Sequence, residues 1–478
     1  MTDLDRRSFL KRGAAVAAGS AVLGGPFAGF VAAGAQATHG TPHGPLIPMP
    51  DMNDQAIRLA LPAGFSYRSF QASGPEPVTL DDGSRLPPRH DGMGAFAGPI
   101  ADATLVRNHE INGPGPAFGG PVYDKNAPGG TTTVHVTNEG VVRGSYASLG
   151  GTQMNCSGGV MPWGSWITCE ETVNGPDVGN DFTGQDNSQL NKPHGFIFEV
   201  PAFEKASTNP IHQAGRFAHE AVAYDPGTRA LYLTEDNFGF PSGFYKYVPP
   251  NDPMKSRKLV DGGKLYMLKV VGQDNAQLAQ SQPQGTEYPV EWVEIRTPWF
   301  NGGKKVRMTN NEAINFVPNQ GLAQGAAKFS RLEGAVYDSG WVYFSSTQGG
   351  GPPPVDGQPG GAPAGYGNGW GQVWGLETAS QTLHLIFESP NREVLDFPDN
   401  VTTSPSGTII LNEDHDQDNY LRGLTRQGAL FDIAKNVFSQ DEFAGSTFSR
   451  TGDTLFVNIQ GSTGRSFAIW GPWESIGV

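Results

Sequence analysis

Six apolar runs that end in polar or acidic residues recur along the chain, and they constrain its fold more than any other feature. The run 163–171 shows the pattern best, because a thiol is followed at once by two carboxylates. The other five runs are 105–110, 231–237, 342–348, 409–415 and 455–460. Each has the length of a strand, and no stretch after residue 40 keeps a helical periodicity. We interpret the runs as equivalent strands of six repeats.

A second motif precedes each of these runs by about ten residues. The six segments are 90–93, 155–158, 219–221, 331–334, 398–401 and 443–446. Several lead through a strand into a hairpin turn such as Asp225-Pro226-Gly227. Because the start of one hairpin strand lies beside the end of its partner, both motifs of a repeat should meet at one rim. The repeats therefore predict twelve short segments around a single site.

The spacing of the repeats favours a β-propeller. Most gaps between the runs fit a blade of four strands plus loops. The 65 Gly, 38 Pro and 17% charged residues favour many turns and few long helices. We predict an all-β fold, a six-bladed β-propeller forming a single domain over 51–478, with loop insertions over the active-site face. The long gap from 231 to 342 holds the insertions 273–286 and 302–319, and an extra blade there is the alternative.

The N-terminus carries the pattern of a twin-arginine export signal. Arg6 and Arg7 precede a Gly/Ala/Val-rich segment, and Ala35-Gln36-Ala37 fits a cleavage site. We predict a signal peptide over 1–37, a flexible lead-in over 38–50, and export by the twin-arginine translocation machinery to the periplasm or the medium. The segment is Gly/Ala-rich and ends in a cleavage motif, which disfavours a stable membrane anchor.

The charge of the chain argues for cations as partners. The formal net charge is −14, and since residues 1–37 hold two acidic and four basic residues, the remainder carries −16. This charge disfavours binding to nucleic acid or an anionic membrane. Carboxylates gathered at one mouth repel one another unless cations lie near them, and calcium is the common choice in exported proteins. The alternative is that the acidic pairs are ordinary solvated strand ends.

Two cysteines and one arginine add chemistry to the acidic motifs. Cys169, beside Glu170 and Glu171, favours a transition metal such as iron or zinc, because calcium avoids sulfur. Nearby acids would raise the pKa of this thiol, which disfavours a nucleophilic role. Cys156 could be a ligand, a packing residue or a disulfide partner. Arg331, placed to share a strand face with Glu333, could be a counter-ion or could bind an anion such as phosphate.

Several of these motifs resemble the PhoX-type alkaline phosphatase family. They are 106–110, 155–159, 168–171, 215–221, 331–334, 412–414 and 456–460, and the resemblance extends over nearly all of the chain after the signal. It implies a twin-arginine-exported β-propeller that hydrolyses phosphomonoesters with a cluster of ferric iron and calcium (Ca2+). Carried over by motif, the implied iron ligands are Cys169, Glu220, Glu333 and Asp414. The implied calcium ligands are Glu171, Asp399 and Glu413, and Arg331 would grip the phosphate.

We therefore expect an exported, metal-dependent phosphatase that acts as a monomer on small phosphate esters. Two alternatives belong to other classes. A calcium-dependent propeller lactonase would need neither the thiol nor the phosphate-binding arginine. A non-catalytic propeller would bind a glycan or a protein at its mouth and use calcium only for stability.

Overall fold

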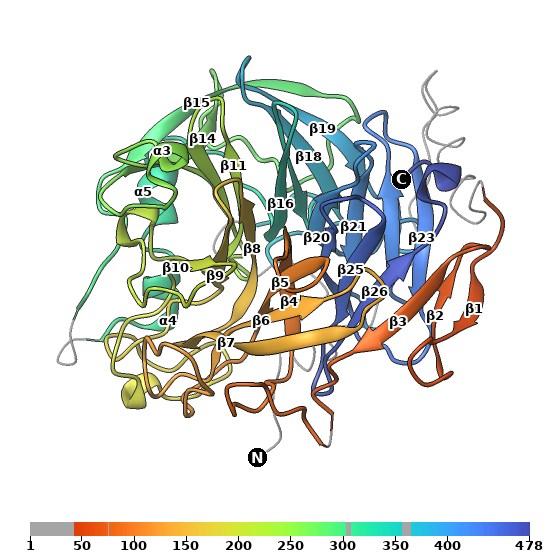
Figure 1. Ribbon diagram of the computed structural model, residues 1–478. Helices are drawn as coiled ribbons and strands as arrows, with labels where there is room; N and C mark the ends of the chain where they lie inside the picture. The colour runs from red at the N-terminus through yellow and green to blue at the C-terminus, as the bar shows by residue number, and fades with distance from the viewer. Residues whose placement is uncertain (1–42, 75, 303–306, 356–364) are drawn as a thin grey trace, which may run out of the picture.

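Antiparallel sheets arranged around a central axis make up the protein (Figure 1). The computed structural model describes residues 43–74, 76–302, 307–355 and 365–478, so the predicted signal peptide lies outside the described residues. The predicted all-β, propeller-like arrangement is confirmed. Among the described residues, no helix combines the length and apolarity needed to cross a membrane.

The first two sheets follow the chain in order. One contains β4 (His90–Ala97), β5 (Ala103–His109), β6 (Gly129–Val136) and β7 (Val142–Thr152). The next contains β8 (Asn155–Met161), β9 (Ser165–Glu170) and β10 (Ile197–Pro201).

The third sheet has nine strands in two successive groups, and β15 of the first group pairs with β19 of the second. The first group is β11 (His219–Asp225), β12 (Ala230–Glu235), β13 (Phe244–Val248), β14 (Lys264–Val270) and β15 (Glu287–Ile295). The second continues with β19 (Thr382–Glu388), β18 (Gln372–Glu377), β17 (Trp341–Ser346) and β16 (Leu332–Asp338).

The last two sheets are completed by strands from the start of the chain. β20 (Pro398–Thr403), β21 (Ile409–Glu413), β22 (Tyr420–Leu424) and β23 (Leu430–Asn436) are extended by β2 (Ile57–Leu61) and β1 (Ile47–Pro50). β24 (Phe443–Phe448), β25 (Thr454–Ile459) and β26 (Arg465–Trp470) are extended by β3 (Ser66–Phe70). Part of the predicted lead-in, residues 47–50, thus forms β1.

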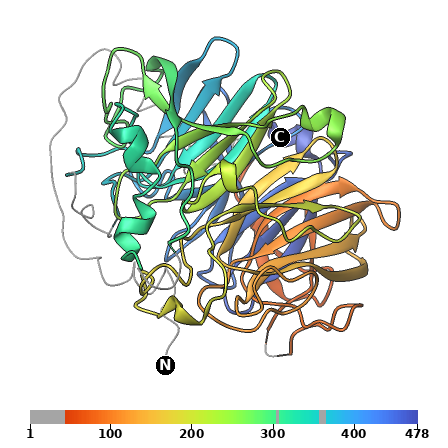
Figure 2. The same ribbon diagram turned by 90° about the vertical axis from the view of Figure 1, so that its left-hand side faces the viewer.

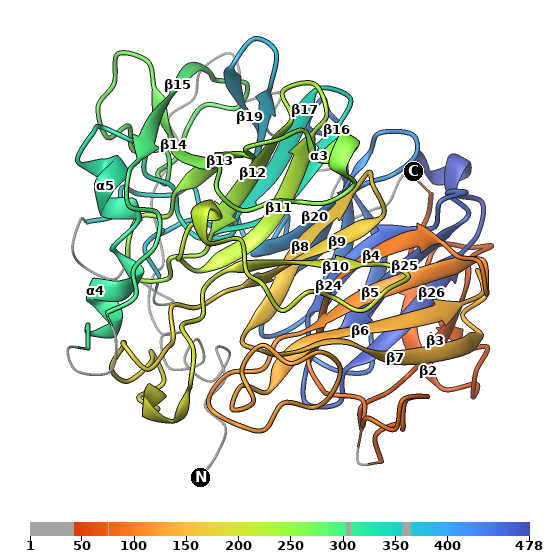
Figure 3. The same cartoon turned by 60° about the vertical axis from the view of Figure 1, so that its left-hand side comes forward.

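The helices of the described residues are short and lie outside the sheets. They are α3 (Pro253–Ser256), α4 (Asn310–Ile314), α5 (Pro318–Leu322) and the 3-10 turns η2 (Asn187–Gln189), η3 (His212–Ala214) and η4 (Trp473–Ile476). α4 and α5 lie on one side of the molecule, away from the sheet β4–β7 (Figures 2 and 3). Both helices belong to the long segment between β12 and β16, in which residues 273–286 lie in the connection from β14 to β15.

Six strands form a closed ring at the centre. We call β4, β8, β11, β16, β20 and β24 the inner strands. β4 contacts β8, each inner strand contacts the next, and β24 contacts β4 again. Each is followed by an antiparallel second strand, and the second strands are β5, β9, β12, β17, β21 and β25. The six predicted runs fall on these second strands.

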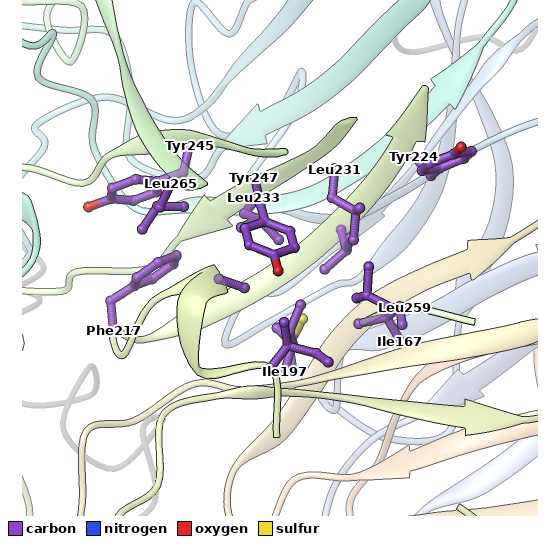
Figure 4. Packing of buried hydrophobic residues seen from close by; sticks show 14 of the residues in the cluster. Ile167, Ile197, Phe217, Tyr224, Leu231, Leu233, Tyr245, Tyr247, Leu259 and Leu265 are labelled. Atoms are coloured by element: carbon purple, nitrogen blue, oxygen red, sulfur yellow. The ribbon is translucent and has the colours of Figure 1, made fainter. Parts of the chain in front are cut away.

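Burial on both faces explains why the second strands read as apolar runs. Every residue of β9 and of β12 is buried. A strand covered on both faces needs apolar side chains on both, and it therefore loses the usual alternation. Ile167 of β9 packs with Ile197, Leu231 and Leu265 in one inter-sheet cluster (Figure 4). Burying each such side chain contributes about 1.5–3 kcal/mol, and this packing fixes the strand ends that carry the polar motifs.

Candidate metal centre and active site

Each inner strand enters its hairpin through a β-bulge at the same place. The register shifts lie between His90/Met93, Asn155/Gly158, His219/Val222, Leu332/Ala335, Pro398/Val401 and Ala444/Thr447. In each case the inner strand has one residue more than its partner. A bulge of this kind re-aims a side chain and is frequent beside active sites.

The first bulged residue carries a metal-binding type of side chain in five of the six hairpins. These residues are Asp91, Cys156, Glu220, Glu333 and Asp399, and we call them the bulge ring. Gly445 holds this place in the sixth hairpin. The repeated bulge therefore places a thiol and four carboxylates at equivalent positions of neighbouring strands.

A second set of side chains follows the second strands. In all six units, the residue after the last paired residue of the second strand donates its N–H to the carbonyl of the residue before the inner strand, over 2.9–3.2 Å. The donors, which we call the closing ring, are Glu110, Glu171, Asp236, Thr347, Asp414 and Gln460. The acceptors, which we call the turn positions, are Arg89, Met154, Ala218, Arg331, Phe397 and Glu442. Both motifs of each repeat thus meet at one rim, which we call the mouth.

The two rings bring donor atoms together in three overlapping groups. The first is Cys156, Glu171 and Glu220, the second is Glu220, Glu333 and Asp399, and the third is Asp399, Asp414 and Glu442. Within each group, one donor atom from each residue lies within 4.8 Å of the others. Glu220 and Asp399 each belong to two groups, so the donors form one connected chain.

The chemistry of these donors fits bound cations. A thiol with two carboxylates suits iron or zinc, whereas groups of carboxylates alone suit calcium. Burial, together with the charges of Glu110 and Asp399, raises the pKa of Asp91 well above its usual range, and a cation would relieve this. The buried Oε1 of Glu110 has no hydrogen-bond partner in the described part of the chain. Six carboxylates and one guanidinium, from Arg89, line the small cavity between the rings.

Five of the metal ligands predicted from the sequence are brought together at the mouth. They are Glu171, Glu220, Glu333, Asp399 and Asp414. Cys169 and Glu413 are not in the donor groups found among the described residues.

The thiol in the donor groups is Cys156 and not Cys169. Cys169 lies in the apolar inter-sheet cluster and pairs across the strands with Ile197. It shares a strand face with Ile167, because side chains alternate along a strand. Cys156 also touches this cluster, but as a bulge residue it aims its Sγ at the mouth, 3.3 Å from the carbonyl oxygen of His219. Both cysteines are unbridged, so the disulfide alternative does not hold.

Glu413 faces its own sheet because it precedes Asp414 by one residue and points to the opposite side. Its Oε1 accepts a hydrogen bond from Arg422 Nε at 2.9 Å. Burial raises the pKa of Glu413 to about 7, although Arg422 opposes the shift. Glu170 and Glu235 are likewise held inside their sheets, by His194 and Tyr245. In each acidic pair, the first carboxylate therefore binds within its sheet and the second lies at the mouth.

Arg331 is buried at the mouth, with a side chain that is 1% exposed. Its Nη2 donates to Asp236 Oδ2 at 3.0 Å and to Glu333 Oε1 at 2.9 Å. The ring of Phe238 lies 5.0 Å from the guanidinium carbon. Its Nη1 is buried and has no hydrogen-bond partner among the described residues, so one donor remains to bind an anion. Arg331 can thus be a counter-ion to Asp236 and Glu333 and bind an anion at the same time.

Several residues that line the cavity were not predicted as site residues from the sequence. Arg89, Asp91, Glu110, Glu442 and Gln460 line the cavity. Asp91 and Glu110 stand in the repeat motifs, at the places that the other ring members occupy, so alignment of the repeats could have found them. Glu442 holds the turn position of the sixth unit, where it accepts the N–H of Gln460 at 3.2 Å, and it directly precedes the motif 443–446, so the same alignment could have found it.

Comparison with known proteins gives a matching family model and structural matches. The family model described as alkaline phosphatase PhoX matches residues 42–463. The solved structure of Pseudomonas fluorescens PhoX in complex with vanadate, a transition state analogue, has a TM-score of 0.62 and 18% sequence identity. The match covers 92% of this chain and 99% of that one, and it shows a common fold.

Weaker matches include a gluconolactonase from Xanthomonas campestris, with a TM-score of 0.39 and 12% identity over 90% of this chain and 98% of that one. Virginiamycin B lyase from Staphylococcus aureus has a TM-score of 0.38 and 10% identity over 85% and 99%. No curated protein matches the chain by sequence.

Proposed function

This chain belongs to the PhoX family of alkaline phosphatases, and from that premise we propose that the mouth is where it hydrolyses phosphate monoesters. In the net reaction, a water oxygen bonds to phosphorus and the ester P–O bond breaks. The alcohol leaves with the electron pair of that bond and takes one proton of the water, and inorganic phosphate keeps the other. The observation that carries this proposal is the chain of three overlapping donor groups beside a buried arginine.

We assign the donor groups to two kinds of cation. Cys156, Glu171 and Glu220 would hold ferric iron, because only this group contains sulfur. The two carboxylate groups, which share Asp399, would hold Ca2+. When bound, such cations polarise the phosphoryl oxygens and neutralise charge that develops in the transition state.

Arg331 would bind the phosphoryl group. Glu333 and Asp236 fix the plane of its guanidinium through Nη2 and Nε, which leaves Nη1 to donate to a phosphoryl oxygen. A guanidinium held in this way donates charge-assisted hydrogen bonds in a fixed geometry. Neither cysteine is an activated thiol, since burial raises the pKa of Cys156 and of Cys169 well above the usual range, and the charges of Glu220 and Glu171 add to this at Cys156. Water is therefore the nucleophile that these residues favour.

The architecture and location of the protein belong to the same proposal. Six inner strands with six equivalent bulges support six blades, with β15 joining the third and fourth. The motif at Arg6 and Arg7 supports a signal peptide over 1–37 and export through the twin-arginine machinery. We expect the exported form to act as a monomer on small phosphate esters.

Elemental analysis combined with p-nitrophenyl phosphate turnover tests the function. The purified, exported protein should contain iron and calcium, and chelation should abolish phosphate release. Glu220→Gln should lower metal content and reduce turnover by at least about 100-fold, because Glu220 belongs to two donor groups. Glu199→Gln is the matched control, since this carboxylate binds Trp163 Nε1 and the Leu259 N–H away from the mouth. Calcium alone with no phosphate release would contradict the proposal and favour a lactonase or a binding propeller.

A further inference from the structure

An apolar pocket of about 110 Å³ adjoins the mouth beside β9 and β12. Its walls include Val173, Phe182, Phe238 and Ile314. These side chains come from three places in the chain: the loop after β9, the loop after β12 and helix α4 of the long insertion. The pocket therefore lies between the rim of the propeller and segments outside its sheets.

The pocket shares a wall with the proposed phosphate-binding group. Glu171 and Asp236 of the closing ring both line it. Asp236 is one of the two carboxylates that hold Arg331, and the ring of Phe238 lies against the same guanidinium. A phosphoryl group bound to Arg331 would thus lie next to an apolar space.

The turn positions give an independent sign of the same asymmetry. Three of them, Arg89, Arg331 and Glu442, are charged, and the other three, Met154, Ala218 and Phe397, are apolar. Met154 and Ala218 are the two turn positions that line this pocket. The mouth thus has an apolar sector at β8 and β11.

The walls of the pocket are held together by packing and hydrogen bonds. Ile314 packs on a cluster that contains Val173 and Val178. The insertion is tied to the loop after β9 by the bonds Met308 N–H to Asp177 O (3.0 Å) and Gly179 N–H to Met308 O (2.7 Å). The buried Arg216 binds the carboxylate of Asp177 at 2.8 Å. The pocket is therefore preformed.

We propose that this pocket binds the alcohol portion of the substrate and makes the enzyme prefer phosphate monoesters of aromatic alcohols. The inference rests on the proposed function and names its substrate class. An apolar cavity of about 150 Å³ accepts benzene in another protein, so a space of about 110 Å³ that is open to solvent suits a single ring. Each methylene buried there raises affinity about fourfold.

Two esters with alcohols of similar acidity separate pocket binding from leaving-group chemistry. The wild-type kcat/KM for benzyl phosphate should exceed that for 2-hydroxyethyl phosphate by on the order of 10-fold. Phe182→Ala and Ile314→Asp should each reduce this ratio to near one. The matched control is Phe203→Ala, because Phe203 and Phe182 are both 47% exposed and Phe203 is not a pocket residue. The control should keep the wild-type ratio.

Calorimetry provides a second readout that does not depend on turnover. Benzylphosphonate should bind on the order of 10-fold more tightly than methylphosphonate, and both pocket variants should lose this difference. If the wild type hydrolyses both esters with equal kcat/KM and binds both phosphonates equally, the pocket inference is overturned while the phosphatase function stands. If the wild type hydrolyses neither ester but binds benzylphosphonate more tightly than methylphosphonate, the result supports the pocket and contradicts the proposed function instead.

Discussion

At the scale of single residues, adjacent side chains with the same chemistry serve different purposes. In Glu413-Asp414, the first carboxylate binds Arg422 within its sheet and the second reaches the donor groups. The cysteines divide in a similar way between the apolar cluster and the mouth. Strand alternation decides the role of each residue, because neighbouring side chains point to opposite faces.

The two cysteines should respond differently to substitution. Cys156→Ala should lower iron content by at least about 10-fold, because it removes the only sulfur from the donor groups. Cys169→Ala should retain iron and reduce the free energy of unfolding by about 1 kcal/mol, as a small cavity in an apolar cluster does. Elemental analysis and urea unfolding of both variants check this. Iron loss in Cys169→Ala alone would contradict the assignment.

His194 should make stability depend on pH. Its Nδ1 lies 2.6 Å from Glu170 Oε1, and its Nε2 lies 3.6 Å from Asp124 Oδ2. Burial lowers the pKa of His194, but these two carboxylates outweigh it and raise the pKa from 6.5 to about 8. Because the folded pKa exceeds the unfolded one, the charged imidazole stabilises the protein below pH 6.5. That contribution is lost as pH rises through about 8.

A variant isolates this effect from other titrating groups. Between about pH 6 and about pH 9, the free energy of unfolding of the wild type should fall by about 2 kcal/mol relative to that of His194→Gln. Chemical denaturation of both proteins at several pH values measures the difference. If the free energies of unfolding of the two proteins change in parallel with pH, His194 is neutral in the folded protein and the expectation is contradicted.

At the scale of the hairpin, the close approach of neighbouring inner strands sets the positions of the bulge ring. A Cβ atom at Gly92 would lie 2.6 Å from Ser157 Cα and 2.7 Å from Cys156 O. Gly92→Ala should therefore push β4 from β8, cost about 1–3 kcal/mol of stability and lower iron content by displacing Cys156. Gly74→Ala is the control, because its Cβ would meet no atom within 4 Å. Thermal unfolding and elemental analysis compare the two, and equal effects would contradict this account.

The hairpins also show which features of the structure can be predicted from the sequence and which cannot. The apolar runs and turn residues predicted the second strands and the meeting of both motifs at one mouth, since burial and hairpin pairing depend on local pattern. The sequence did not reveal the bulges, and each bulge shifts the alternation of side chains by one residue. That shift places Cys156 at the mouth, while regular alternation keeps Cys169 in the core. Glu442 holds the turn position of the sixth unit, and the tertiary structure brings it beside Asp414 of the fifth.

At the scale of the whole molecule, the donor groups connect units that are far apart in the chain. Their residues belong to the units of β8, β11, β16 and β20, and to the segment before β24. The same units otherwise meet through their inner strands, and N-terminal strands complete the last two sheets. Cations at the mouth would therefore link five units, while carboxylates without cations would repel one another across the same space.

Removal of the cations should consequently lower the stability of the entire ring. Chelated protein should unfold at a lower temperature, and the loss should be smaller at high salt, which screens the repulsion between carboxylates. Returning calcium should restore stability by about 1.4 kcal/mol per tenfold rise in concentration for each saturating site. Differential scanning calorimetry across a calcium titration measures this slope. Asp399→Asn should flatten it, because Asp399 belongs to both carboxylate groups. If neither the chelator nor calcium changes the unfolding transition temperature, the ring is held by its inner strands alone.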